Sequence, residues 1–501
     1  MEGPSMADGA EIELKLHIPA ASWRSVETFV RGRGAGAEQI DLHAAYFDTP
    51  DGRLAAERIA WRVRRENDSW VQTLKGHVAD DDGMTRHEHE VTVTRSAVKR
   101  PDPGRHAGTP IGERLIALLA DATHDAAPTE RFHTEITRLA RTARTAGGTV
   151  QYALDRGAVV SGDGRARHEI SELEIELVSG SPTAVLRAAR AAATRHGLWI
   201  DTVNKARHGG IVSSGSTTAP VARATMPALH KTMSAEHATR TMMRACLVHV
   251  LDNTSVIAHG FDGPEHAHQA RVGLRRLRTV IRVFGDLLTD LDPTWEPRLA
   301  DAFTALGAAR DRHVALERWT APLAKVGAPD VRLPEAEVDL GAIFRGVDWT
   351  LLVLDLLDAV HAGSPLDDEP GALRVKPVVG DRLDGLRRAA LRAPKSFAGR
   401  EPDEQHTIRK RVKRLRDISE LTASLYKPAR VRRFVKSLPP ALDALGTLQD
   451  LDAACAIYES LAVEDPDALF AVGWFRGRRP AVVKECIAPL RTAANADPHW
   501  R

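Results

Sequence analysis

Hydrophobic and polar residues alternate in short runs over the first part of the chain, from Glu11 to about Ile211. Alternation with a period of two is typical of strands that bury one face, so we predict that this part is mostly strand. Only three of its segments have a helical pattern, and these are Ser22–Arg33, Ile111–Ala122 and Thr183–His196.

The pattern changes after a segment of small polar residues that ends in a proline, Ser213–Pro220. Such a segment cannot build a packed face, so we predict a linker. From about Ala228 onwards, long segments rich in Ala, Leu and Arg follow a 3.6-residue period, which indicates an all-α part. The predicted organisation is an α+β domain over residues 1–212, a linker over 213–228 and an all-α domain over 229–501.

The chain has 501 residues, of which 43% are hydrophobic and 27% are charged. A chain of this length and composition is expected to fold into two or more domains rather than to stay disordered. Its 69 Lys and Arg residues nearly balance its 67 Asp and Glu residues, so the net charge of +2 says little about partners. The sequence leaves the oligomeric state open.

The three cysteines, Cys246, Cys455 and Cys486, lie far apart and form no C-x-x-C pair. This spacing argues against a disulfide framework or a zinc knuckle and favours a reducing, cytoplasmic environment. No stretch approaches the roughly 20 apolar residues that a membrane-spanning helix needs, and the N-terminus has no signal-peptide pattern. We therefore expect a soluble protein that is not exported and has no membrane partner.

Two elements of the helical part occur twice, in the same order. His268-x-x-Arg271-x-x-x-Arg275-x-x-Arg278 recurs as His406-x-x-Arg409-x-x-x-Lys413-x-x-Arg416. Likewise, Leu306-Gly307-x-x-Arg310-Asp311 recurs as Leu445-Gly446-x-x-Gln449-Asp450. Both second copies follow about 140 residues after the first, which indicates a duplicated helical bundle.

In the strand part, the charged residues lie on one face of each predicted strand, because residues i, i+2 and i+4 of a strand share a face. They include Glu11, Glu13 and Lys15, then Arg62 and Arg64, then Thr73 and Lys75, then Glu172, Glu174 and Glu176. A sheet with its polar face in water would explain any one of these strands. Three glutamates in a row repel one another, however, so cations must offset them.

If the strands close into a tunnel with their apolar faces outward, the glutamates and the cations converge in its lumen. Carboxylates bind hard divalent ions such as Mg²⁺ or Mn²⁺, which also bridge to phosphate oxygens. Arg and Lys can bind the remaining phosphate oxygens. Such a lumen suits a short polyphosphate better than a neutral ligand.

The ordered motifs of this part resemble those of the CYTH domain of the triphosphate tunnel metalloenzymes, up to about Gly210. They are Glu11-x-Glu13-x-Lys15, Tyr46-Phe47-Asp48-Thr49-Pro50-Asp51, Arg62-x-Arg64, Leu74-Lys75, Ala153-Leu154-Asp155-Arg156-Gly157, Glu172-x-Glu174-x-Glu176 and Lys205. The resemblance implies an eight-stranded antiparallel β tunnel with flanking helices. It also implies cleavage of tripolyphosphate or an organic triphosphate with Mg²⁺ or Mn²⁺.

The resemblance further implies roles for single residues. The metal would be held by Glu11, Glu13, Asp155, Glu172, Glu174 and Glu176. The phosphates would be bound by Lys15, Arg62, Arg64, Lys75, Arg138 and Lys205, and the catalytic set would be Glu11, Glu13 and Lys15. Glu88 and Glu90 match an acidic pair of the family, and Asn204 stands where the family often has serine. Water, rather than a side chain, would attack the terminal phosphoryl group.

Each copy of the first repeated motif places its basic residues on one narrow stripe of a helix, since positions 0, 3, 7 and 10 share a face. Arg282 extends the first stripe, and the opposite side is predicted to pack inside through Leu274, Leu277, Ile281 and Phe284. No acidic residue occurs from His268 to Arg282 or from His406 to Arg416. Solvated helix faces usually mix both signs, so we expect a polyanion to offset the repulsion. No aromatic residue interleaves with either stripe, which disfavours nucleic acid.

The duplicated stripe and the Leu-Gly motif resemble a CHAD domain over about residues 229–490. This resemblance implies two pseudo-symmetric four-helix bundles that bind inorganic polyphosphate. The residues implied are His268, Arg271, Arg275, Arg278, Arg282, His406, Arg409, Lys413 and Arg416.

The two resemblances together thus imply a cytoplasmic inorganic triphosphatase whose helical domain binds polyphosphate, in association with polyphosphate granules. Two alternatives stay open. One is a non-catalytic polyphosphate-binding or granule-targeting protein with a degenerate tunnel. The other is an adenylate cyclase or a thiamine triphosphatase on the same tunnel. The histidines of His87-Glu88-His89-Glu90 and of Glu265-His266-x-His268 diverge from their neighbours, so neither segment is predicted to bind metal.

Overall fold

The computed structural model describes residues 10–32, 36–76, 84–98, 100–120, 127–332, 338–362, 372–392 and 394–501, without the side chains of residues 10, 85, 86, 97, 98 and 308–317. The chain forms two compact units. The tunnel unit consists of residues 1–223, 251–266 and 341–361, and the helical unit consists of residues 224–250, 267–340 and 362–501. The two units therefore do not follow the chain as two continuous segments.

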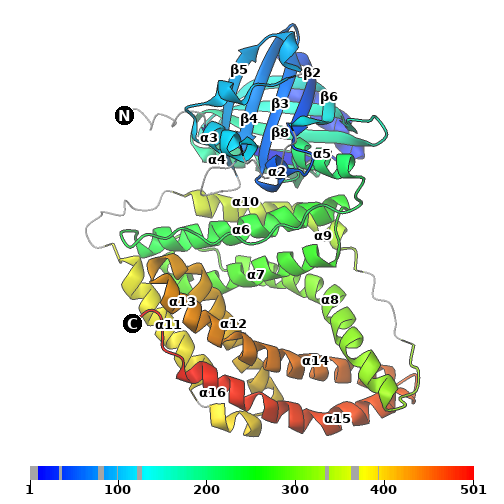
Figure 1. The fold of residues 1–501 in the computed structure, drawn as a ribbon, viewed down its shortest axis with the longest axis vertical. Coiled ribbons are helices and arrows are strands. Elements are labelled where there is room, and N and C mark those ends of the chain that lie inside the picture. The colour runs from blue at the N-terminus through cyan, green and yellow to red at the C-terminus, as the bar shows by residue number, and fades with distance from the viewer. Residues whose placement is uncertain are drawn as a thin grey trace. The chain divides into compact units, whose positions relative to one another are not determined.

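The tunnel unit is built on an antiparallel sheet with the strand order β5-β4-β3-β2-β6-β7-β8-β1-β9 (Figure 1). Strand β1 also pairs with β5, so the eight long strands close on themselves. The short strand β9 pairs with the end of β1. The strands are β1 Ala10–His17, β2 Glu38–Asp48, β3 Ile59–Glu66, β4 Ser69–Gly76, β5 Thr85–Val93, β6 Thr129–Thr145, β7 Gly148–Ser161, β8 Arg167–Gly180 and β9 Trp199–Ile200.

The apolar faces of the strands point outward under helices, as predicted. Leu54, Trp61, Leu74 and Ile111 form one buried cluster on strands β3 and β4 and the helices that cover them, while α4 packs on β1 and β8. The helices of this unit are α1 Trp23–Arg31, α2 Arg53–Ala56, α3 Pro110–Leu119, α4 Pro182–His196, α5 Lys205–Ser214, α9 Leu340–Arg345 and α10 Val347–His361, with the 3₁₀ turns Ala20–Ser22, Arg95–Val98 and Pro103–His106.

The three predicted helices correspond to α1, α3 and α4, and the predicted end residues Arg33 and Ala122 lie outside the described residues. Helices α2 and α5 were not predicted. Helix α5 begins after Asn204, whose side-chain oxygen accepts a hydrogen bond from the backbone N–H of Arg207 at 2.9 Å. It reaches Ser214 and so covers the first residues of the predicted linker, while residues 215–234 contain no helix.

Helix α5 packs against the inner side of the sheet. Tyr46 pairs directly with Arg62 on β3 and Phe132 on β6, so all three side chains share a face. Tyr46 and Phe132 belong to a buried apolar cluster against which Ala206 of α5 packs. A Cβ added at Gly209 would overlap the Phe132 ring, so glycine allows the close approach. The lumen is therefore partly apolar, beside the charged residues predicted for it.

The helical unit contains both copies of the repeat. The first copy lies on α7 and α8 and the second on α12 and α14, which confirms the predicted order of elements. The predicted core positions Leu274, Leu277, Ile281 and Phe284 are buried. The helices are α6 Ala235–His259, α7 Pro264–Phe284, α8 Trp295–Lys325, α11 Val375–Leu391, α12 Pro402–Leu421, α13 Pro428–Ser437, α14 Pro439–Leu461, α15 Ala468–Glu485 and α16 Ile487–Asn495, with the 3₁₀ turns Gly285–Leu287, Pro394–Gly399 and Ala423–Leu425. The end of α6 from Leu251 and the start of α7 up to His266 belong to the tunnel unit.

The predicted fold class, an α+β part with a closed antiparallel sheet followed by an all-helical part, is confirmed. Within the described residues, no helix combines the length and the apolar character needed to cross a membrane. The three cysteines are free.

Candidate functional site

Lys75 is the centre of one charged group in the lumen. Its Nζ lies 2.7 Å from Glu11 Oε2, 2.9 Å from Glu88 Oε2 and 3.4 Å from Glu13 Oε2. Burial raises the pKa of Glu11 to about 8 although Lys75 opposes this shift. Burial also tends to raise the pKa of Glu88, but Lys75 and Arg62 outweigh it and hold that pKa well below its usual range. Glu11 and Glu88 therefore differ in protonation although they share one cation.

Lys205 is the centre of a second group. Its Nζ lies 2.7 Å from Asp155 Oδ2 and 2.9 Å from Glu174 Oε1, and it also pairs with Glu172. The guanidinium of Arg138 donates to both oxygens of Asp155 at 2.7 Å and reaches Glu174 at 2.5 Å. One carboxylate oxygen each from Asp155, Glu172 and Glu174 lie within 4.8 Å of one another, so these residues form a group that could hold a metal.

Lys15 is almost fully buried and pairs with Glu172 at 3.1 Å and with Asp201 at 3.3 Å. Its ammonium also donates to the backbone carbonyl of Val203. Burial alone would lower the pKa of Lys15, but Asp201 and Glu172 raise it above the usual value. Asp201 was not predicted as a site residue, because no strand pattern or motif marks it in the sequence.

Arg62 and Arg64 both lie on β3 and share the face of that strand that points into the lumen. Arg62 Nη2 lies 3.3 Å from Glu88 Oε1, and Arg62 Nη1 donates to the Tyr46 hydroxyl at 3.3 Å. Arg64 Nη2 lies 3.2 Å from Glu90 Oε1 and also pairs with Glu66. All six cations predicted for the tunnel are thus paired with carboxylates inside it.

Glu13 and Glu176 face each other directly on β1 and β8. Burial and the charge of Glu13 raise the pKa of Glu176. Two opposed carboxylates beside Glu11 are the hard oxygen donors that Mg²⁺ and Mn²⁺ prefer. These three residues therefore fit a divalent ion by their chemistry.

Asp48 of the Tyr46–Asp51 motif has a structural role. Its Oδ1 accepts hydrogen bonds from the backbone N–H groups of Thr49 at 2.7 Å and Leu54 at 2.8 Å. Its Oδ2 accepts from the N–H of Ala55 at 3.0 Å. The carboxylate thus holds the turn between β2 and α2, which explains a conspicuous motif without involving it in chemistry.

In the helical unit, a basic pocket of ≈390 Å³ lies between the repeat helices. Its lining includes the cations Arg275, Arg318, Arg409, Lys413 and Arg416 and the acids Asp417 and Asp443. Arg318 of α8 was not predicted, since it belongs to neither motif. It donates to Asp450 at 3.0 Å and to the Thr447 hydroxyl at 2.7 Å.

Acidic residues from outside the two stripes face them, so part of the repulsion for which we expect a polyanion is offset within the protein. Arg275 donates to both oxygens of Asp417 at 3.0 Å, and Asp417 directly follows the second stripe. Arg278 and Arg282 pair with Glu296 of α8, and Arg416 pairs with Glu420.

Lys413 lies close to other cations of the pocket. Burial, followed by the charges of Arg409, Arg275 and Arg271, lowers the pKa of Lys413 to about 7. The negative charge of Asp417 raises the pKa of Lys413, but this effect is too weak to reverse the shift. Since five cations and two acids line the pocket, its positive charge exceeds the negative charge of its own acids.

The two repeated motifs contact each other, which explains why they recur together. In the first copy, the Arg271 guanidinium lies 4.7 Å from the centroid of the Phe303 ring, and a Cβ on Gly307 would approach that guanidinium to 3.2 Å. In the second copy, His406 Nδ1 bonds to the Gln449 side chain. His268 is half-buried on α7, and the side chains of Arg310 and Asp311 lie outside the described residues.

Comparison with known proteins matches two family models, a CYTH domain over residues 9–209 and a CHAD domain over residues 241–459. Among solved structures, the CHAD domain from the plant Ricinus communis is 22% identical, with 56% of this chain and 98% of that chain covered and a TM-score of 0.44. A Hippeastrum protein described as a candidate adenylyl cyclase with a dominant triphosphatase activity is 18% identical, with 41% and 96% covered and a TM-score of 0.31. PptA from Streptomyces chartreusis is 18% identical, with 52% and 99% covered and a TM-score of 0.36.

The two family matches fall on the two kinds of site described above. The CYTH match contains every predicted tunnel residue, and the CHAD match contains both basic stripes. The chain therefore has a CYTH domain in residues 9–209 followed by a CHAD domain in residues 241–459.

Proposed function

We propose that the CYTH domain hydrolyses inorganic tripolyphosphate to pyrophosphate and phosphate with Mg²⁺ or Mn²⁺, and that the CHAD domain binds inorganic polyphosphate. The observation that carries the first proposal is the pairing of all six tunnel cations with lumen carboxylates. An incoming triphosphate can take over these cations, and the carboxylates they leave can accept a divalent ion. The triphosphate would thus take the place of the carboxylates as partner of the cations, and the metal would take the place of the cations as partner of the carboxylates.

Glu11, Glu13 and Glu176 are the residues that would hold the ion. Bound there, it would supply positive charge at the reacting phosphate and a water of lowered pKa. Arg62, Arg64, Lys75, Lys15, Arg138 and Lys205 would bind the phosphate oxygens and stabilise charge that develops on them. The water oxygen would bond to the terminal phosphorus as the bond from that phosphorus to the bridging oxygen breaks. Pyrophosphate would leave with the electron pair of the broken bond, and the proton of the water would pass to the phosphate products or to solvent. Asp155, Glu172 and Glu174 stay predicted metal ligands.

Phosphate release from tripolyphosphate, ATP and thiamine triphosphate, each with and without Mg²⁺ or Mn²⁺, tests this proposal. We expect metal-dependent turnover that is fastest with tripolyphosphate. Faster turnover of thiamine triphosphate, or cyclic AMP formation from ATP, would replace the substrate assignment. Absence of turnover with all three substrates would support the non-catalytic alternative.

The variant Glu11→Gln should lower the rate of phosphate release from tripolyphosphate by about 100-fold or more, because glutamine cannot ionise to supply the carboxylate that a bound divalent ion requires. Glu169→Gln is a matched control, since Glu169 is exposed on β8 and pairs with Arg167 rather than with the tunnel residues. Circular dichroism should show both variants folded. Undiminished turnover in folded Glu11→Gln would contradict the proposed role of this group.

The pocket around Lys413 supports polyphosphate binding by the CHAD domain. The positive charge of this pocket exceeds the negative charge of the acids that line it. Affinity for polyphosphate should fall steeply as salt is added, and single-stranded DNA of equal charge should compete poorly. Equal affinity for the two polymers would instead assign the pocket to polyanions in general. Polyphosphate binding would also place the protein on polyphosphate granules in the cytoplasm.

A further inference from the structure

Four histidines and one aspartate gather at one end of the tunnel, away from the group around Lys75. His17 ends β1, His168 lies at the start of β8, His208 lies on α5 and His259 ends α6. His17 and His168 share strand faces with Lys15 and Glu172, so they lie at the end of the lumen. Asp201 follows β9 and completes the group. All five residues belong to the tunnel unit.

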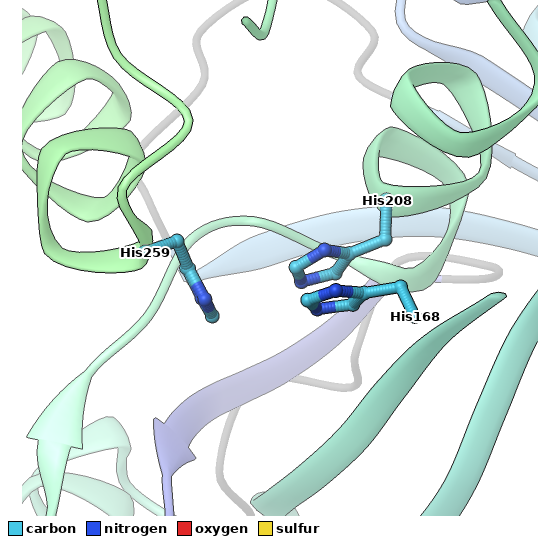
Figure 2. A group of neighbouring side chains, drawn as sticks. All are labelled: His168, His208 and His259. Carbon is cyan, nitrogen blue, oxygen red and sulfur yellow. The ribbon is translucent and has the colours of Figure 1, made fainter. Parts of the chain in front are cut away.

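Three of these histidines converge (Figure 2). The rings of His168 and His208 stack with centroids 4.4 Å apart, and the His259 ring stands nearly perpendicular to that of His208 at 4.9 Å. One nitrogen from each of the three rings lies within 4.8 Å of the other two. Modest shifts of these side chains would bring all three nitrogens to the roughly 2.0 Å bonds of a single zinc ion.

Packing alone does not satisfy the polar atoms of the group. His208 is 2% exposed, and its Nδ1 has no hydrogen-bond partner among the described residues. A buried nitrogen without a partner costs stability, and such atoms are rare in folded proteins. Neighbouring Phe261 stacks on His259, which explains the close packing of the rings but leaves this nitrogen unbonded.

The protonation of the rings also suits a metal. Burial, together with the charge of His259, lowers the pKa of His168 and holds the pKa of His208 well below its usual value. Both rings are therefore neutral at physiological pH and have a lone pair available. Asp201 Oδ2 lies 3.1 Å from His259 Nε2 and supplies negative charge beside the group.

We propose that His168, His208 and His259 bind one zinc ion, with Asp201 as the carboxylate next to it. Imidazole nitrogens favour Zn²⁺, whereas the carboxylates around Lys75 favour Mg²⁺ or Mn²⁺, so this site is distinct in chemistry from the tunnel site. The ion would link β8, α5 and α6. It would also fix Asp201, which orients Lys15 at the end of the lumen.

Zinc content tests the proposal directly. The full chain, prepared without a histidine tag and stripped by a chelator, would be dialysed against Zn²⁺ in the presence of excess Mg²⁺. Bound zinc would then be measured by mass spectrometry. We expect one zinc ion per chain, a higher melting temperature with zinc, and visible absorption of tetrahedral Co²⁺ when Co²⁺ replaces Zn²⁺.

Variants locate the ion. His208→Gln and His168→Gln should each weaken zinc binding by about 100-fold or more, since even loss of an outer-shell partner costs 10- to 100-fold. His43→Gln is the matched control, because His43 is exposed on β2. Glu13→Gln should keep the zinc, which separates this site from the proposed triphosphatase site.

Wild-type protein that binds no zinc would overturn the proposal, and so would histidine variants that bind as much zinc as the wild type. Loss of zinc in Glu13→Gln alone would assign the ion to the tunnel carboxylates instead. If buried His208→Gln fails to fold by circular dichroism, the half-buried His168→Gln decides the outcome.

Discussion

Lys413 links the charge of the CHAD pocket to pH. Because its pKa is lowered to about 7, this lysine is mostly neutral at pH 8 when no ligand is bound. Polyphosphate would stabilise its charged form and raise that pKa, so binding at pH 8 should take up close to one proton. The affinity should consequently fall as pH rises above 7. Calorimetry in two buffers of different ionisation enthalpy measures this proton uptake.

Lys413→Arg is the control for this effect, because arginine stays charged throughout the range. The variant should bind polyphosphate at pH 8 at least as tightly as the wild type and take up less proton. Burial and the charge of Lys410 lower the pKa of His406, so any proton uptake by this histidine would occur at lower pH. Equal proton uptake by the two proteins would show that another group titrates.

The identity of these site residues could be predicted from the sequence, because periodicity fixes which side chains share a face. Their partners could not. Glu296 faces the first stripe from α8, and Asp417 faces it from the end of α12. Which helix packs against which depends on the shape and burial of both surfaces, and the period of one helix contains no information about the other.

Among the elements, α5 has two adjacent glycines with opposite surroundings. An alanine at Gly209 would overlap the Phe132 ring, whereas a Cβ at Gly210 would meet no atom within 4 Å. Gly209→Ala should therefore lower the free energy of unfolding by about 1–3 kcal/mol. Gly210→Ala should raise it by up to about 1 kcal/mol, because alanine favours the helix.

Urea denaturation of the two variants measures both effects. The pair is informative because the two substitutions are chemically identical and one residue apart. Equal effects of the same sign would mean that α5 does not pack against Phe132 as described. A loss in Gly209→Ala alone would support the close packing of α5 against Phe132.

The same helix shows why some elements were missed. The segment Lys205–Ser214 has two glycines and two serines, which lower helix propensity and interrupt the apolar period. The helix is instead stabilised by its packing on β6 and β7 and by the Asn204 cap. The strands, by contrast, were predictable because each buries one face over part of its length.

For the whole molecule, the net charge of +2 hides two different arrangements of charge. The tunnel cations are paired and largely buried, whereas the CHAD pocket has excess positive charge. Raising salt from 50 to 200 mM should therefore weaken polyphosphate binding by as much as about 1000-fold. The KM for tripolyphosphate should change much less, because buried charges are screened less.

Binding and steady-state kinetics on the same preparation measure both responses. Glu11→Gln should keep the affinity for polyphosphate and its salt dependence although it loses hydrolysis. Parallel salt responses of the KM and of polyphosphate affinity would argue that one site accounts for both. Loss of both hydrolysis and polyphosphate binding in folded Glu11→Gln would likewise argue that one site accounts for both.

The sequence pattern divides the chain at a linker, but the compact units interleave across that point. Residues 251–266 and 341–361 follow the linker and still pack with the strands. Arg190 of α4 pairs with Asp355 of α10, and the backbone N–H of Ile200 donates to the buried Thr350 hydroxyl at 3.2 Å. Contacts between residues this far apart in the sequence leave no local pattern.

This interleaving limits how the gene can be rearranged. A recombination event between codons 212 and 229 would separate the strands from α10 and from the end of α6. The strand half would then expose the surface of α4 that α10 covers, and the helical half would carry segments without their packing partners. Exchange of either half with another protein would therefore be selected against unless those segments moved with the strands, so the two domains of this chain should be inherited as one piece.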